Sequence, residues 1–144
     1  MEWVDPLGLA TRANNGKYHI FFDFILDDKN IFSSDSVQFN RANKKLFEEL
    51  NSDLSFRRDM LKRYPELSSW KVDSKSPPGL TWHHHEDLGR LSLVDRTDHS
   101  SNHALYHPTG KGGRDIWGGG EDGRRGKLDG KTGELKSKGS KPCS

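Results

Sequence analysis

Cysteine and apolar residues are both scarce in this chain of 144 residues. The single cysteine, Cys143, has no partner for an internal disulfide, which fits function in a reducing compartment. Hydrophobic residues make up only 31% of the sequence, and the mean hydropathy is −0.93. The longest apolar stretch, residues 20–26, is interrupted by Asp23 and is too short to span a bilayer. We therefore expect no membrane insertion, and the acidic start of the chain predicts no signal peptide.

A large excess of either charge is also lacking. The 23 Lys and Arg residues stand against 21 Asp and Glu residues, so the formal net charge is +2 with neutral histidines. This balance argues against a uniformly basic nucleic-acid binder, and any positive surface must be local. The length fits a single domain. Because the low apolar content leaves little for a large core, a bound metal would add folding free energy that such a domain needs.

Histidine, by contrast, is concentrated in one segment. Six of the seven histidines fall between His83 and His107, and the seventh, His19, is expected to be structural. Imidazole is the commonest metal ligand and is the side chain that changes charge near neutral pH. The segment has no cysteine, and an all-histidine site more naturally leaves a coordination position open for water or substrate. The pattern therefore indicates a catalytic metal site, as in a metal-dependent nuclease.

The spacing within this segment predicts a β-hairpin. Residues 77–79 indicate a turn, and residues 80–85 have the β-branched and aromatic content of a strand. Side chains alternate in a strand, so His84 would share one face with Leu80 and Trp82, and His83 and His85 would share the other face. Residues 86–89 indicate a turn, and residues 90–94 would return as the second strand.

A short helix is predicted after the hairpin. Asp98 or Thr97 would cap this helix, and His99 and His103 lie four residues apart. On a helix this spacing puts both imidazoles on one face with Cβ atoms about 5–6 Å apart, near enough to share one ion. A hairpin followed by a helix, with histidines on both, is the ββα-metal arrangement, and the expected fold class is α+β.

These motifs resemble the HNH (endonuclease VII) superfamily of nucleases. The run Trp82-His83-His84-His85 looks like the WHH branch found among bacterial polymorphic toxins, and residues 90–103 are similar to the colicin-type DNases with their helical His-x-x-x-His pair. The resemblance covers roughly residues 77–120 and implies a nuclease core over residues 77–117. The chain departs from the pattern at Arg90, which stands where the family has its middle Asn.

The resemblance implies a metal ligand followed directly by a general base. In the first assignment, His84, His99 and His103 hold one divalent cation, and His85 takes a proton from the attacking water. The expected ion is Zn, Mg, Mn or Ni, because imidazole suits Zn, Ni and Mn and nucleases of this kind work with several metals. DNA is the expected substrate.

The triple histidine leaves a second assignment open. If the adjacent pair is His83 and His84, the metal ligand becomes His83 and the base becomes His84. His107 either replaces His103 as a ligand or contacts phosphate. Four cations near the site are expected to contact phosphates: Arg90, Arg96, Lys111 and Arg114. The alternative function is a non-catalytic, metal-stabilised module that binds nucleic acid or a protein.

A second resemblance lies at the amino terminus. Residues 3–9 match the DPxGL signature that ends the core of Rhs proteins, through Asp5, Pro6, Gly8 and Leu9. The resemblance implies cleavage after Leu9 by the parent Rhs core and release of residues 10–144 as a toxin. It also implies a cognate immunity protein, delivery by a contact-dependent route such as type VI secretion, and action in the target-cell cytoplasm. The alternative is a simple surface turn.

The remaining segments are predicted to support this core. Residues 10–76 should form a supporting region, with a strand or short helix over 18–26 after the turn at residues 14–16. Apolar residues recur at helical spacing from Phe39 to Leu50 and again from Phe56 to Tyr64. From Gly118 the composition turns rich in Gly and Lys, so residues 118–144 are predicted to be a flexible tail whose cations contact phosphate or solvent.

Overall fold

A computed structural model describes residues 18–107, 111–129 and 132–136, apart from the side chain of His103. The Rhs-type signature residues Asp5, Pro6, Gly8 and Leu9 lie outside the described residues, as do residues 137–144 of the predicted tail. Within the described ranges, the helices are all too short or too polar to cross a membrane.

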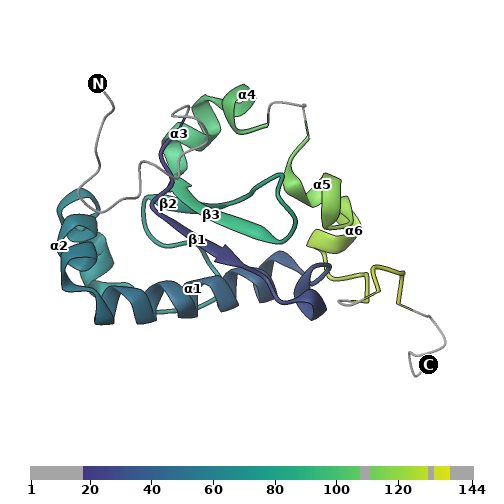
Figure 1. Ribbon diagram of the computed structural model, residues 1–144, viewed down its shortest axis with the longest axis horizontal. Coiled ribbons are helices and arrows are strands. Elements are labelled where there is room, and N and C mark those ends of the chain that lie inside the picture. The colour runs from purple at the N-terminus through teal and green to yellow at the C-terminus, as the bar shows by residue number, and fades with distance from the viewer. Residues whose placement is uncertain (1–17, 108–110, 130–131, 137–144) are drawn as a thin grey trace.

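The described chain is a mixed α+β domain built around a three-stranded antiparallel sheet. The strands, in the spatial order β1-β3-β2, are β1 (Phe22–Ile25), β3 (Arg90–Asp95) and β2 (Leu80–His84) (Figure 1). The β2–β3 pair confirms the predicted hairpin, and Gly89 turns the chain with a φ of 71°, in the region that favours glycine. Because β2 is an edge strand, side chains from both of its faces can reach a cavity along its free edge.

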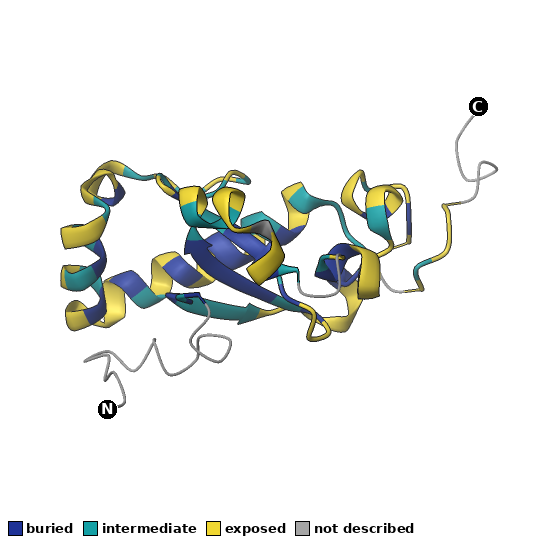
Figure 2. Cartoon of the chain, turned by 90° about the horizontal axis from the view of Figure 1, so that it is seen from above, coloured by how far each residue is buried: buried dark blue, intermediate teal, exposed yellow. Residues whose placement is uncertain are grey.

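The two faces of the sheet are covered by different elements. The helix α1 (Asp35–Ser52) runs along one face, which carries Leu80, Trp82, Leu91 and Leu93 (Figures 1 and 2). The opposite face has a smaller buried cluster formed by Tyr18, Ile20, Val94 and Tyr106. The predicted alternation along β2 is therefore confirmed, since Trp82 faces α1 and its neighbour His83 contacts Tyr18 and Tyr106.

The two helices predicted from apolar spacing are both present. Ser34 caps α1 by accepting a hydrogen bond from the Val37 N–H, and Asp53 caps α2 (Leu54–Arg63) in the same way through the Phe56 N–H. A side-chain cap of this kind stabilises a helix by about 1 kcal/mol. Two 3-10 turns, η3 (Asp28–Asn30) and η4 (Pro65–Ser69), connect these helices to the rest of the fold.

The helix after the hairpin differs from its prediction in both its start and its end. The cap is Asp95, not Asp98 or Thr97: the Asp95 carboxylate accepts from the Asp98 N–H at 2.8 Å. As a result, α3 (Arg96–Ser101) begins directly where β3 ends. The helix also stops at Asn102, and a separate turn, α4 (His103–Tyr106), follows. The predicted single helix carrying both His99 and His103 is therefore wrong.

Two further short helices occupy the end of the molecule beside the β2–β3 turn. These are α5 (Gly113–Trp117) and α6 (Gly120–Arg124) (Figure 1). The Trp117 indole N–H donates to the His85 carbonyl at 2.7 Å, which anchors α5 to the end of β2. Thus part of the segment predicted as tail has structure, including a β-bridge between Leu128 and Leu135.

Candidate metal centre

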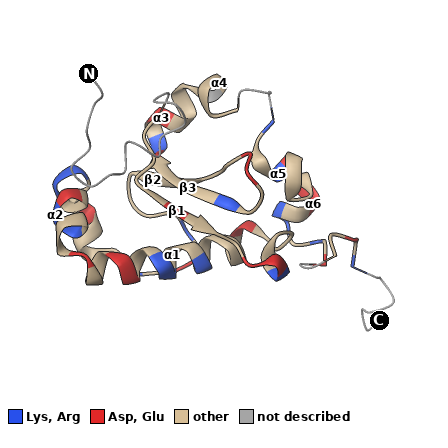
Figure 3. Cartoon of the chain, viewed as in Figure 1, with Lys and Arg blue, Asp and Glu red and all other residues tan. Residues whose placement is uncertain are grey.

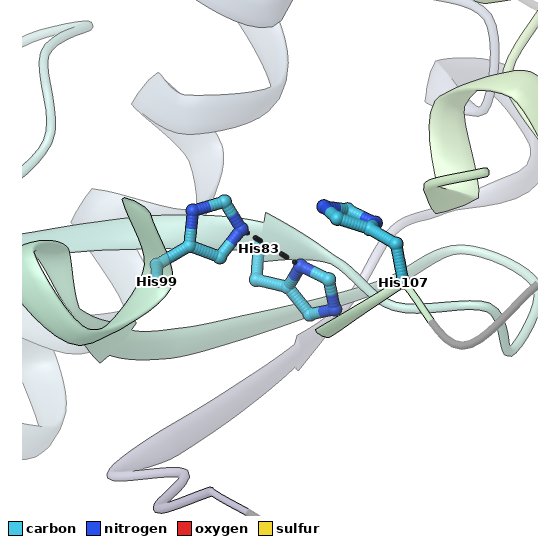
Figure 4. A group of neighbouring side chains, drawn as sticks. All are labelled: His83, His99 and His107. Atoms are coloured by element: carbon cyan, nitrogen blue, oxygen red, sulfur yellow. Dashed lines mark hydrogen bonds between the residues drawn. The ribbon is translucent and has the colours of Figure 1, made fainter. Parts of the chain in front are cut away.

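Three histidines from three different elements converge on one side of the sheet. His83 lies in β2, His99 in α3 and His107 directly after α4, and each offers one ring nitrogen within 4.8 Å of the others (Figure 4). His83 Nδ1 lies 3.2 Å from His99 Nε2. The ring centroids of His83 and His107 are 5.1 Å apart. The described residues therefore include a compact cluster of three imidazoles.

Local interactions explain why these rings meet. The Asp95 cap starts α3 at the end of β3, beside β2, so His99 lies over His83 one turn later. The Tyr106 hydroxyl donates a short hydrogen bond to Asp98 Oδ2, which ties α4 to α3 and places His107. Burial and this contact raise the pKa of Tyr106 well above its ordinary value, so the hydroxyl stays protonated.

The loop after His107 also depends on a close approach. A Cβ atom added to Gly112 would lie 2.8 Å from His107 Cε1, so a larger residue there would displace the imidazole. Gly113 is still more restricted, since its Cβ would lie 2.2 Å from the His85 carbonyl oxygen. The two adjacent glycines therefore let the chain turn tightly over the cluster into α5.

The donor set fits a divalent transition metal. Two imidazole nitrogens bound tetrahedrally to zinc would be about 3.3 Å apart, given Zn–N bonds of about 2.0–2.1 Å. The observed separation between His83 and His99 is 3.2 Å. Burial, with a smaller effect of His99, lowers the pKa of His83 to about 2, so its ring is neutral at pH 7 and keeps a lone pair for a cation. Three protein nitrogens also leave one tetrahedral position open for water or substrate.

His83 is not a satisfied core histidine. It is 2% exposed, and its Nε2 has no hydrogen-bond partner within the described part of the chain. A structural histidine at this depth would ordinarily have both ring nitrogens hydrogen-bonded. The nitrogen without a partner is Nε2, whereas Nδ1 is the nitrogen that faces His99, so the described residues leave the burial of Nε2 uncompensated.

His84 points to the opposite face, toward α1. Its Nε2 lies 2.8 Å from Gln38 Oε1 and 3.6 Å from Asp35 Oδ1. Burial first, and then the nearby guanidinium of Arg114, lower the pKa of His84 to about 3, which keeps this imidazole neutral as well. His84 nevertheless lines the same cavity of about 290 Å³ as the three clustered histidines, because that cavity follows the free edge of β2.

His85 lies outside that cavity. It is 4% exposed, its Nδ1 accepts the Asp87 N–H at 3.0 Å, and its Nε2 lies 3.4 Å from Arg90. Arg90 in turn donates to both carboxylate oxygens of Asp23 at 2.9 and 3.0 Å and to Asp87 at 3.0 Å. The structure therefore places His85 and Arg90 in an ion-pair network at the turn end of the sheet and does not bring them to His99 or His107.

The other cations expected at the site have different surroundings. Arg114 is 2% exposed and donates to Asp35, the Ser33 carbonyl and the Gly118 carbonyl, so it holds α5 against the start of α1. Arg96 donates to the Leu80 carbonyl at 3.0 Å. Lys111 is exposed at the edge of the described loop. Of these cations, Arg114 lines the cavity of the clustered histidines.

Arg124, which lines this cavity, and Gln38 and Asp35, which contact His84, were not assigned to the site from the sequence. Arg124 has a side chain that is 52% exposed, and its Nε lies 3.5 Å from Asp35 Oδ2 at the mouth of the cavity. Gln38 and Asp35 come from the first turn of α1. The available signal was the polar Gln38 four residues before Ala42, within the apolar stripe of α1, but nothing local indicates its partner 46 residues away.

Charged residues of both signs lie on the helices and beside the cavity. Both basic and acidic residues occur along α1 and α2, and blue and red are interspersed in the view of Figure 3. The guanidinium groups of Arg114 and Arg124 both converge on Asp35 beside the cavity. A phosphate entering there would meet Arg124, whose side chain is half exposed to solvent.

Comparison with known proteins assigns the chain to a family. No curated protein and no solved structure matches the chain. A family model described as the DNase/tRNase domain of colicin-like bacteriocin matches residues 14–105, more than half of the chain. The matched span contains β1, the hairpin, α1, α2 and α3, and therefore His83, His84 and His99. The chain thus belongs to the family of DNase/tRNase domains of colicin-like bacteriocins, the nuclease toxin domains of bacteriocin type.

Proposed function

We propose that the chain is an HNH-type, metal-dependent endonuclease that hydrolyses phosphodiester bonds of DNA. His83, His99 and His107 hold one divalent cation, and His84 is the general base. The observation that carries this proposal is the single cavity of about 290 Å³ lined by all four histidines together with Arg114 and Arg124. The hairpin followed directly by α3 is the ββα order expected of an HNH nuclease and supports that assignment. Both faces of β2 also contribute side chains to the cavity.

Each residue has a separate task in this mechanism. Once bound, the cation would supply Lewis-acid stabilisation of the charge that develops on the phosphate oxygens. His84 accepts the proton of the attacking water, and Arg124 binds a phosphate oxygen of the substrate. Asp35 holds Arg124 from the other side through the contact at 3.5 Å.

Substrate binding also favours the proton-accepting role of His84. In the free protein the positive charges of Arg114 and Arg124 contribute to its lowered pKa, after burial. A phosphate docked against Arg124 offsets that charge and raises the pKa of His84 toward the range in which a general base is effective. Binding of the substrate phosphate thus raises the pKa of the residue that acts as its general base.

Supercoiled plasmid is expected to be nicked and linearised by the protein in the presence of Zn, Ni, Mn or Mg, and chelation should stop cleavage. Cleavage is measured on agarose gels of plasmid incubated with each metal, with a chelator control. Transfer RNA is included as a parallel substrate. Cleavage of the RNA alone would replace DNA by RNA as the substrate, whereas metal binding without cleavage of either would favour a non-catalytic, metal-stabilised binding module.

We further propose that residues 1–9 are the end of an Rhs core and that residues 10–144 are the released WHH-type toxin. The support is the sequence signature at Asp5, Pro6, Gly8 and Leu9. On this proposal the toxin is delivered by a contact-dependent route such as type VI secretion, acts in the target-cell cytoplasm, and is neutralised in the producing cell by an immunity protein.

Expression in a bacterial cytoplasm tests this boundary. Residues 10–144 should be as toxic as the full chain, because the processing signal is separate from the nuclease, and the His84→Ala form of either should be tolerated. Colony counts after induction measure the effect. Loss of killing on deletion of residues 1–9, with the remaining protein still soluble, would mean that the amino-terminal segment belongs to the active domain.

A further inference from the structure

Two buried amides project from α1 toward β2 and use the same hydrogen-bonding pattern. Gln38 and Asn43 are both 0% exposed. The Gln38 NH₂ group donates to the carbonyls of Asn30 at 2.9 Å and Ile31 at 3.0 Å, and its oxygen faces His84. The Asn43 NH₂ group likewise donates to two loop carbonyls, at 2.8 and 2.6 Å, and its oxygen accepts from the Trp82 indole N–H. Each amide therefore joins a loop, α1 and one β2 side chain.

This pattern determines which end of the Gln38 amide meets His84. Backbone carbonyls only accept hydrogen bonds, so the two that contact Gln38 require its NH₂ group. Flipping the amide would put its oxygen against both carbonyl oxygens and leave buried groups unpaired, which is costly. The Gln38 oxygen must therefore be the atom 2.8 Å from His84 Nε2. An oxygen acceptor there requires a proton on Nε2.

A second hydrogen-bond acceptor near His84 Nε2 also favours a proton on that nitrogen. Asp35 Oδ1 lies 3.6 Å away and is also an acceptor, already engaged by Arg114. With its proton on Nε2 facing these two oxygens, a neutral His84 imidazole has its lone pair on Nδ1. The hydrogen bonds of α1 thus select one of the two tautomers of this imidazole.

We propose that Gln38 is a positioning residue of the nuclease, which holds His84 as the Nε2–H tautomer so that Nδ1 is the atom that accepts the proton from water. This proposal rests on the role of His84 as general base. Asn43 provides the matched comparison, since it makes the same set of contacts with Trp82, a side chain without a part in proton transfer.

The first test needs no variant. Long-range ¹H–¹⁵N NMR spectra of the metal-free wild-type protein distinguish the two neutral tautomers of each imidazole, and His84→Ala identifies the signal. We expect His84 to be protonated on Nε2. A proton on Nδ1 would overturn the proposal directly, whatever the activity of the enzyme.

Paired substitutions then separate positioning from general stability. Gln38→Met and Asn43→Leu each remove a buried amide, so both should lower the unfolding temperature. Only Gln38→Met should mix the His84 tautomers and lower kcat, by about 10–100-fold as for loss of other orienting partners, without weakening zinc binding. Gln38→Glu keeps an acceptor oxygen toward His84 and should keep the Nε2–H tautomer, but its second oxygen would face the Asn30 and Ile31 carbonyls, so it should lower the unfolding temperature.

The remaining outcomes have distinct meanings. An equal loss of kcat in Asn43→Leu would make the effect of Gln38→Met structural and would overturn the positioning role. So would an unchanged tautomer and kcat in Gln38→Met while His84→Ala is inactive. Full cleavage by His84→Ala would instead overturn the base assignment of the proposed function, and the positioning role with it.

Discussion

Replacement of His84 by alanine is expected to lower plasmid cleavage by about 10²–10⁴-fold, the usual contribution of a general base. Zinc binding should be retained, because the three clustered nitrogens come from His83, His99 and His107. The His84 side chain contacts Gln38 and the rings of Phe39 and Trp117, so circular dichroism is needed to establish that the variant is folded. Initial rates of plasmid nicking, at saturating metal, measure the effect.

His85→Ala provides the comparison for that result. Its ring lies with Arg90 and Asp87, away from the cavity, so its removal should reduce stability more than turnover. If His85→Ala is folded, binds zinc and has lost cleavage while His84→Ala cleaves normally, the base is His85, as in the first assignment made from the sequence, but the ligand role which that assignment gave to His84 is excluded.

Replacement of His99 or His107 by alanine is expected to weaken zinc binding strongly. Loss of a residue that only orients a ligand weakens metal binding by about 10–100-fold, and loss of a ligand should weaken it more. Each variant removes one of three nitrogens that lie within 4.8 Å of one another. Calorimetric titration of the metal-free protein with zinc measures the affinity. Zinc should also raise the unfolding temperature of the wild-type protein, since a ligand that binds only the folded state stabilises it.

Two other histidine variants complete this series. His19→Ala removes an imidazole that packs against the Phe21 ring, outside the cluster, and should leave the zinc affinity unchanged. His103→Ala decides between the two ligand sets derived from the sequence. Unchanged affinity in His107→Ala together with a large loss in His103→Ala would move the third ligand to His103.

Much of the fold could be predicted because the determining interactions are local. Alternation along residues 80–85 correctly assigned His83 and His84 to opposite faces, since a strand repeats every two residues. The apolar residues of α1 and α2 recur with the period of a helix, and this local spacing was sufficient to predict both helices. The concentration of histidine indicated a metal-dependent nuclease without any knowledge of which rings meet.

Which residues make up the site depended on the tertiary structure. Asp95, Thr97 and Asp98 are all good cap residues, and only the end of β3 selects Asp95. The break at Asn102 then removes the continuous helix that would have put His99 and His103 on one face.

The sequence by itself thus determined the hairpin, the helices and the chemical class, because periodicity, capping and composition are read over a few neighbouring residues. Only the tertiary structure brought His107 over His83, Arg124 to the mouth of the cavity, and Gln38 within 2.8 Å of His84. The physical reason is that the partners are far apart in the sequence, with 24 residues from His83 to His107 and 46 from Gln38 to His84. Contacts at such distances arise from the packing of α1, α4 and α6 around the edge strand, which no local pattern encodes.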